Sequence, residues 1–198
     1  TLVEKDLTKL LAGITMPSYP ELIIDGLNIK YVGDVNNFKL KLAAGVNSGK
    51  ILIDSNFDLG LKRPRYDIML TTSSLDLSPI INQKSDINLN AKIQGNGFNI
   101  EDLEANVNLT ALNSSFLTYY SDSLKITFNA KDKLFETNLL GSVNQAVYSL
   151  KGNLDYTNSS NPIYSLNGNL KSFDIGKYTN DSTQNSNINL SFNVDAQN

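Results

Sequence analysis

The chain has 198 residues and a formal net charge of −3, and it contains neither cysteine nor histidine. This composition excludes disulfides, thiolate catalysis, Cys-ligated metals and acid–base chemistry by an imidazole. The longest basic cluster is Lys62-Arg63-Pro64-Arg65, which we interpret as a solvated turn. Nucleic-acid binding has little support, because a surface that follows phosphates needs a larger basic patch.

The N-terminal segment is the one part of the chain with helical periodicity. Apolar residues recur at spacings of three and four from Leu2 to Leu11, and Gly13 and Pro17 follow. This spacing predicts a short helix near residues 2–12, with a linker that reaches residue 21. No stretch approaches the roughly 18 apolar residues that a spanning helix requires.

From Leu22 onward, apolar and polar residues alternate with the period of a strand that has one buried face. Turn signals such as Gly33-Asp34, Asn47-Ser48-Gly49 and Gly95-Asn96-Gly97 separate the alternating segments. The pattern predicts about ten strands, in a sandwich, a closed sheet or a long meander. The clearest alternating segments are Leu27–Tyr31, Phe38–Leu42, Tyr66–Leu70, Ile87–Ile93, Leu103–Leu109, Leu124–Phe128 and Ile188–Val194.

An internal repeat divides the alternating region. When the chain is shifted by about one hundred residues, identical residues coincide, and insertions fall at predicted turns. The matched pairs include Asp25/Asp122, Leu27/Leu124, Ile29/Ile126, Phe38/Phe135, Asn47/Asn144, Pro64/Pro162, Tyr66/Tyr164, Ser74/Ser172, Asp76/Asp174, Ser85/Ser186 and Asn88/Asn189. We therefore predict a first β repeat over residues 22–120 and a second, incomplete one over 121–198. Since the second copy stops before a counterpart of Leu103–Leu109, we expect the chain to be a single all-β segment (1–198) of a longer protein.

Several motifs give the chain a resemblance to a known family. Leu75-Asp76-Leu77 precedes a spacer and the strand Ser85–Leu89, and a Gly-rich turn leads into Glu101-Asp102-Leu103. Phe173-Asp174-Ile175 with Ser186–Leu190 is a second occurrence. This pattern resembles AsmA/TamB-type proteins of the Gram-negative envelope. The resemblance implies an elongated, curved antiparallel sheet, open as a β-taco or groove, in the periplasm, with the full-length protein anchored to the inner membrane through parts outside this chain.

Together, the repeat and the resemblance favour a hydrophobic groove over an ordinary sandwich core. Stacked one-sided strands would make one continuous apolar face. We expect this face to bind or conduct phospholipids or other apolar chains between the membranes, or to aid outer-membrane protein assembly, with outer-membrane assembly proteins as possible partners and with no cofactor or metal. The predicted lining residues are Leu27, Ile29, Phe38, Leu42, Tyr66, Ile68, Ile87, Leu89, Val107, Leu124, Ile126, Phe128, Ile188 and Leu190.

Two other kinds of function fit the sequence less well. An enzyme would have to rely on carboxylates such as Glu101-Asp102, which we interpret as a solvated pair in a turn, so we predict that the chain is not an enzyme. A surface-exposed carbohydrate-binding or adhesive module would suit the Asn- and Ser-rich polar face. Such a module would be expected to expose aromatic residues for sugar stacking, yet Tyr31, Phe38, Tyr66, Phe128 and Phe135 fall in the apolar register.

Overall fold

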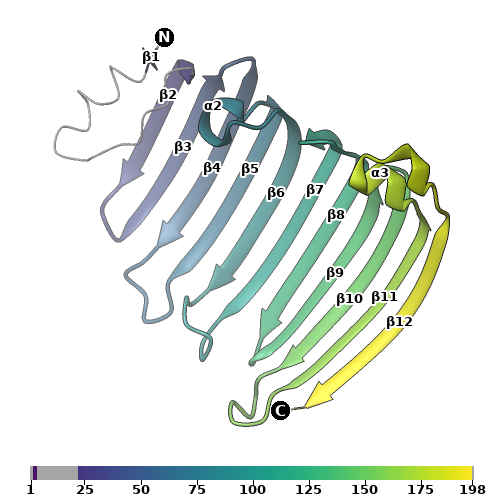
Figure 1. Ribbon diagram of the computed structural model, residues 1–198. Helices are drawn as coiled ribbons and strands as arrows, with labels where there is room; N and C mark the ends of the chain where they lie inside the picture. The colour runs from purple at the N-terminus through teal and green to yellow at the C-terminus, as the bar shows by residue number, and fades with distance from the viewer. Residues whose placement is uncertain (1, 4–21, 198) are drawn as a thin grey trace.

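A single antiparallel sheet makes up most of the molecule (Figure 1). The computed structural model describes residues 2–3 and 22–197, and 69% of it is strand, which confirms the all-β prediction. Twelve strands follow one another in the sheet in the same order as in the sequence. They are β1 (Leu2–Val3), β2 (Ile23–Gly33), β3 (Asn37–Val46), β4 (Gly49–Asp58), β5 (Arg65–Leu75), β6 (Ser85–Asn96), β7 (Glu104–Phe116), β8 (Tyr119–Lys131), β9 (Leu134–Val143), β10 (Ala146–Asp155), β11 (Ile163–Phe173) and β12 (Ile188–Gln197).

The short helices of the described residues lie between strands. Helix α2 (Ser78–Ile81) follows β5, and helix α3 (Ile175–Thr179) follows β11 with a 3₁₀ turn (Ser182–Gln184) after it. The predicted helix near residues 2–12 falls mostly outside the described residues. Its first two residues are not helical, because Leu2 and Val3 pair with Ile24 and Ile23 as strand β1.

The register of the sheet separates two chemically different faces. Directly paired residues of neighbouring antiparallel strands point to the same face, and alternate residues of one strand share a face. The row through Ile29, Leu42, Ile53 and Leu70 is apolar across the whole sheet. The adjacent row on the other face contains Lys30, Lys41, Asp54, Met69, Lys92, Asn108, Thr127, Asn138, Lys151, Asn167 and Asn193.

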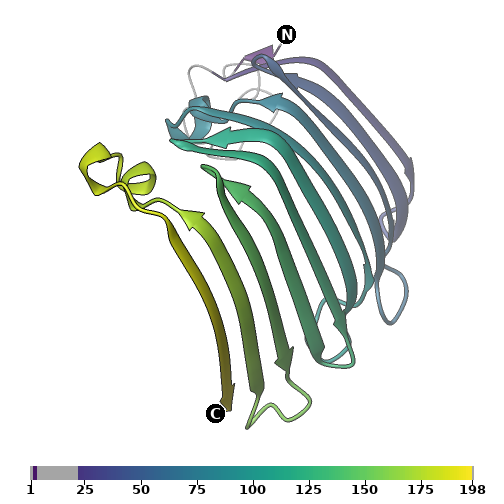
Figure 2. The ribbon, with the colours of Figure 1, turned by 90° about the vertical axis from the view of Figure 1, so that its right-hand side faces the viewer.

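The strands are bowed, and both helices lie on the inner side of the bend (Figure 2). The residues that contact the helix segments belong to the apolar rows: Leu77, which precedes α2, packs against a cluster that contains Val46, and the Tyr178 hydroxyl of α3 contacts that of Tyr148. The apolar face is therefore the concave one. We call the strand ends that carry α2 and α3 the upper rim, and the opposite strand ends the lower rim.

The register shifts lie at the upper rim, where they bend individual strands. Ser74 in β5 and Ser172 in β11 both have positive φ, at 47° and 55°, beside such shifts. The amide of Ser74 donates to the side chain of Asn88 at 2.8 Å, and the amide of Ser172 donates to that of Asn189 at 3.1 Å. The same bulge thus occurs at matched positions of the two copies.

Hydrogen bonds at a second pair of positions confirm that the architecture repeats. Asn47 and Asn144 occupy hairpin turns, with φ of 52° and 48°. The side-chain oxygen of Asn47 accepts from the amide of Ile23, and that of Asn144 accepts from the amide of Tyr120, at 2.8 Å in each case. Strands β2 to β6 of the first copy correspond in order and direction to β8 to β12 of the second, while β7 lies between them.

The densest packing lies at the upper rim of the first copy. Leu22, Ala44, Val46 and Leu75 are all less than a tenth exposed, and Ile24, Ile51, Leu77 and Ile87 pack around them. The loop that ends in α2 folds over this cluster on the concave side. Elsewhere the concave face is not covered to the same extent, since Ile29 is 57% exposed and Leu190 50%.

Candidate functional site

The concave face forms an apolar trough that crosses the whole sheet. Four consecutive rows of paired residues make its floor, three of them from β2 to β12 and the fourth from β3 to β12, and together they contain no charged side chain. The rows run from Gly33 to Ala196, from Tyr31 to Val194, from Ile29 to Phe192 and from Ala44 to Leu190. With strands about 4.8 Å apart, the eleven strands from β2 to β12 give the trough a length of about 50 Å.

The sheet register brings the predicted lining residues onto this one face. Tyr66 is buried, while Leu27, Ile29, Ile188 and Leu190 are exposed and the others lie between these extremes. Leu27 lies beside the bulge of β2, and Ile87 belongs to the packed cluster under the α2 segment. The remaining members are Phe38, Leu42, Ile68, Leu89, Val107, Leu124, Ile126 and Phe128, which lie in the four rows.

Sequence reasoning missed part of this face. Strands β4, β9, β10 and β11 contribute residues to every row, yet none of them was among the clearest alternating segments. Their apolar alternation is interrupted by small or polar residues, namely Ser55, Thr137, Gly152 and Gly168. The missed lining residues include Ile53, Phe57, Leu139, Leu150, Leu154, Tyr164 and Leu166.

Two hydroxyl groups on the trough floor have hydrogen-bond partners within the sheet. The Ser55 hydroxyl donates to the carbonyl of Leu40 at 3.0 Å, and Ser55 is 1% exposed. The Thr72 hydroxyl donates to the carbonyl of Ile87 at 2.9 Å. Since their hydrogen bonds are satisfied, these two side chains do not make the floor a polar binding surface.

An aromatic cluster closes the upper rim of the second copy. The ring of Tyr178 in α3 lies 4.6 Å from that of Phe173 and 5.6 Å from that of Tyr119. Its hydroxyl contacts the Tyr148 hydroxyl and donates to the carbonyl of Val143 at 3.1 Å. Burial and the neighbouring Tyr148 raise the pKa of the Tyr178 hydroxyl, so it stays neutral and holds α3 against the trough.

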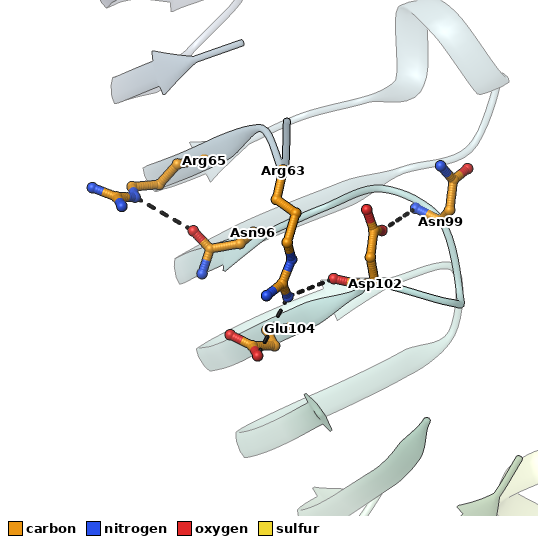
Figure 3. Close-up of polar contacts among 6 residues, drawn as sticks. All are labelled: Arg63, Arg65, Asn96, Asn99, Asp102 and Glu104. Atoms are coloured by element: carbon orange, nitrogen blue, oxygen red, sulfur yellow. Dashed lines mark hydrogen bonds and ion pairs between the residues drawn. The ribbon is translucent and has the colours of Figure 1, made fainter. Parts of the chain in front are cut away.

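At the lower rim, the loop between β6 and β7 carries an aromatic side chain over the trough. The ring of Phe98 stacks on that of Tyr66 with centroids 5.3 Å apart, although Phe98 is 61% exposed. Arg63 holds this loop in place (Figure 3). Its guanidinium donates to the carbonyl of Asp102 at 2.7 Å and pairs with Glu104 at 3.3 Å.

Four of the charged groups noted in the sequence, Arg63, Arg65, Glu101 and Asp102, have structural roles at this rim. The Asp102 carboxylate accepts from the amide of Asn99 at 3.3 Å, and the Arg65 guanidinium donates to Asn96 at 3.4 Å (Figure 3). Glu101 forms an ion pair with Lys133. Each carboxylate or cation is engaged with a neighbour, and none of them reaches the apolar rows.

The floor of the trough has a hollow of about 270 Å³ in the second copy. It is centred on Gly152 of β10 and lies between Phe128 on one side and Val194 on the other. Phe135, Thr137, Leu154, Tyr164 and Leu166 complete the part of its lining that belongs to the concave face. Glu136, Asn153 and Ser165 also border the hollow, but they pair with one another in a row of the convex face.

Neither a metal site nor a membrane-spanning helix is found in the part of the chain that the structure describes. No three acidic residues among residues 2–3 and 22–197 converge as metal ligands would. None of the helices there has the length and apolar character needed to cross a bilayer.

We compared the chain with protein families, with curated proteins and with solved structures. No family model matches it, and neither a curated protein nor a solved structure shows significant similarity to it. The feature of the molecule that bears on its function is the trough itself, with an open, uncharged, apolar floor that continues along the sheet and with partly covered rims.

Proposed function

We propose that the chain is a β-groove segment that binds acyl chains of lipids along its concave face and conducts them across the sheet, without catalysis. The observation that carries this proposal is the absence of charge from four consecutive rows of the trough floor between β2 and β12. A large exposed apolar surface is unfavourable in water and usually marks a binding site. Covering it contributes about 25 cal/mol per Å² of apolar area.

The chemistry of the floor favours a hydrocarbon over a polypeptide as the ligand. Every floor strand from β3 to β11 is hydrogen-bonded on both sides, so the floor offers few free backbone groups. A polypeptide that lay on the floor would leave its own amides and carbonyls unpaired in an apolar setting, at a cost of about 1–3 kcal/mol each. An acyl chain carries no such groups, so it loses nothing when the trough removes it from water.

The composition of the convex face is in keeping with a ligand that contacts the concave face alone. Three paired rows of that face are mainly polar and contain no aromatic residue between β2 and β12; their apolar members are Val32, Ala43, Leu52, Met69 and Leu140. Sugar-binding surfaces use exposed aromatic rings, so these rows do not favour the carbohydrate-binding alternative. The setting that best fits a lipid conduit of this kind is the periplasm, as in the AsmA/TamB-type proteins that the sequence resembles.

Mass spectrometry of lipids extracted from protein purified without detergent tests the proposal. We expect wild-type protein to retain phospholipid or fatty acid, and Ile126→Arg to retain less than about a tenth as much, because a charge in the trough must be desolvated when a chain covers it. The matched control is Asn129→Arg, which places the same charge on the convex face of the same strand. Equal lipid content in all three proteins, or none in any, would contradict a lipid-binding trough.

A further inference from the structure

The two copies differ in how well they fill the second row of the trough floor. In the first copy, this row contains Leu40 and Ser55 in neighbouring strands β3 and β4. At the matched positions, strands β9 and β10 of the second copy carry Thr137 and Gly152. Both replacements reduce apolar volume at adjacent positions, which leaves the hollow of about 270 Å³.

The adjacent row shows that the sheet compensates for a small residue elsewhere. Where the first copy pairs Leu70 with Ala91, the second pairs Gly168 with Phe192. A Cβ atom at Gly168 would meet the ring of Phe192 at 2.3 Å, so that ring already occupies the space above the glycine. Large and small residues have exchanged places across this pair, and the floor stays filled.

Gly152 is less covered than Gly168. A Cβ atom placed there would meet Cγ2 of Thr137 at 3.0 Å, a tight contact with a small side chain, and Cδ1 of Leu166 at 3.7 Å, and no aromatic ring occupies the space above the glycine. Protein interiors leave few voids of this size unfilled, since the lining atoms forfeit their dispersion contacts. The hollow is also uncharged and opens onto the trough, so an apolar ligand segment can enter it.

We propose that the Gly152 hollow is the seat for one hydrocarbon chain of a bound lipid, and that Thr137 and Gly152 give the second copy an affinity for that chain which the first copy lacks. This inference rests on the proposed lipid-binding function and adds a location to it. The occupant is a single uncharged chain, because the one charged residue that borders the hollow, Glu136, belongs to a row of the convex face, where it pairs with Asn129 and Asn153. The floor strands also have no free backbone edge there.

The chain contains no tryptophan, so a single engineered one reports on its own surroundings. Tyr164→Trp places the reporter at the edge of the hollow, and Tyr31→Trp places a second reporter on the same face in the first copy. The probe is stearic acid with a nitroxide on its acyl chain, which quenches tryptophan fluorescence at short range. The titration gives an apparent affinity at each reporter.

Two substitutions fill the hollow. Thr137→Leu introduces the residue that the first copy carries at this position, and Gly152→Leu fills the centre directly. Asn167→Leu is the matched control, because it adds the same side chain to the convex face of the neighbouring strand, where Asn167 is exposed. Far-ultraviolet circular dichroism and thermal unfolding identify any variant that fails to fold, and Thr137→Leu then carries the test alone.

We expect Thr137→Leu and Gly152→Leu to weaken the affinity seen by the Tyr164→Trp reporter about tenfold, with the Tyr31→Trp reporter and the Asn167→Leu control changed less than about twofold. Unchanged affinity at Tyr164→Trp in a folded Thr137→Leu protein, or an equal loss at both reporters, would overturn the hollow as a seat while leaving the trough as a lipid site. Absence of quenching at both reporters in otherwise unchanged protein would overturn the proposed function itself.

Discussion

Asp76 and Asp174 anchor the two rim helices by the same hydrogen bonds. One carboxylate oxygen of Asp76 accepts from the amides of Ser78 and Ser85 at 2.9 and 3.3 Å. The matching oxygen of Asp174 accepts from the amides of Gly176 and Ser186, at 3.0 Å each. In both copies a serine hydroxyl, that of Ser85 or Ser186, also accepts from the amide that follows the aspartate. The helices at the upper rim are therefore part of the repeat.

The hydrogen bonds that Asp76 accepts predict that the fold loses stability at low pH. Hydrogen bonds from Ser78 and Ser85 lower the pKa of Asp76 below its ordinary value of 3.8. A lowered pKa in the folded state stabilises the fold above pH 3.8, and this contribution is lost as the pH falls through the folded pKa. We expect Asp76→Asn to cost about 1 kcal/mol at pH 7 and less near pH 2, measured by urea unfolding. A penalty that did not decrease in acid would contradict a role for the carboxylate charge.

The raised pKa of Tyr178 predicts that the fold loses stability in alkali. Its pKa is raised, mainly by burial, so its contribution is complete below the ordinary tyrosine pKa of 10.0 and is lost as the pH rises above that value. Tyr178→Phe removes the bond to the carbonyl of Val143 and should cost about 1 kcal/mol at pH 7. Thermal melts between pH 9 and 12 should show a smaller decrease for Tyr178→Phe than for wild type. An equal decrease in the melting temperatures of the two proteins would show that a group other than Tyr178 causes the loss of stability in alkali.

The packed cluster at the upper rim predicts where truncation is costly. Leu75 is 6% exposed in that cluster, whereas Leu52 is 51% exposed on the convex face. Leu75→Ala should lower the free energy of unfolding by about 2–5 kcal/mol, because it leaves a cavity. Leu52→Ala should change it by less than about 1 kcal/mol. Equal losses in chemical denaturation would show that the packing at this rim does not dominate stability.

The contacts of Arg63 predict that its removal makes the loop at the lower rim more mobile. Removing its contacts with Asp102 and Glu104 frees the loop that carries Phe98. We expect Arg63→Ala to speed chymotryptic cleavage after Phe98 several-fold, with global stability changed by less than about 1 kcal/mol, since the ion pair is solvent-exposed. Lys62→Ala is the control, and an equal increase for that variant would indicate a general effect of lost charge.

Alternation and turn chemistry were enough to predict the fold class from the sequence. Strands β2, β3, β5, β6, β8 and β12 each contain a predicted segment, and β7 contains all of its segment except Leu103. The repeat was detectable because Asn47 and Asn144, and Asp76 and Asp174, hold turns that few other residues could hold. Both copies keep the same residue at these positions because its side chain makes the same hydrogen bond. They are therefore easier to match than apolar positions, where one apolar residue can replace another.

The parts that could not be predicted depend on register between distant residues. Gly152 and Thr137 weaken the alternation of their own strands, and only the pairing of β9 with β10 makes them adjacent. Helices α2 and α3 are too short to carry a periodic pattern, and their position depends on the Asp76 and Asp174 anchors. The exchange of Leu70 and Ala91 for Gly168 and Phe192 is likewise visible only once the strands are paired.

Site-specific photo-crosslinking tests whether acyl chains bind to the concave face alone. A photoreactive residue at Ile126 lies on the concave face in the third row, while one at Asn129 lies on the convex face of the same strand. In protein incubated with phospholipid vesicles, we expect adducts with the mass of a lipid at Ile126 and none at Asn129. Lipid adducts at both positions, or at neither, would contradict a one-sided apolar trough that binds acyl chains.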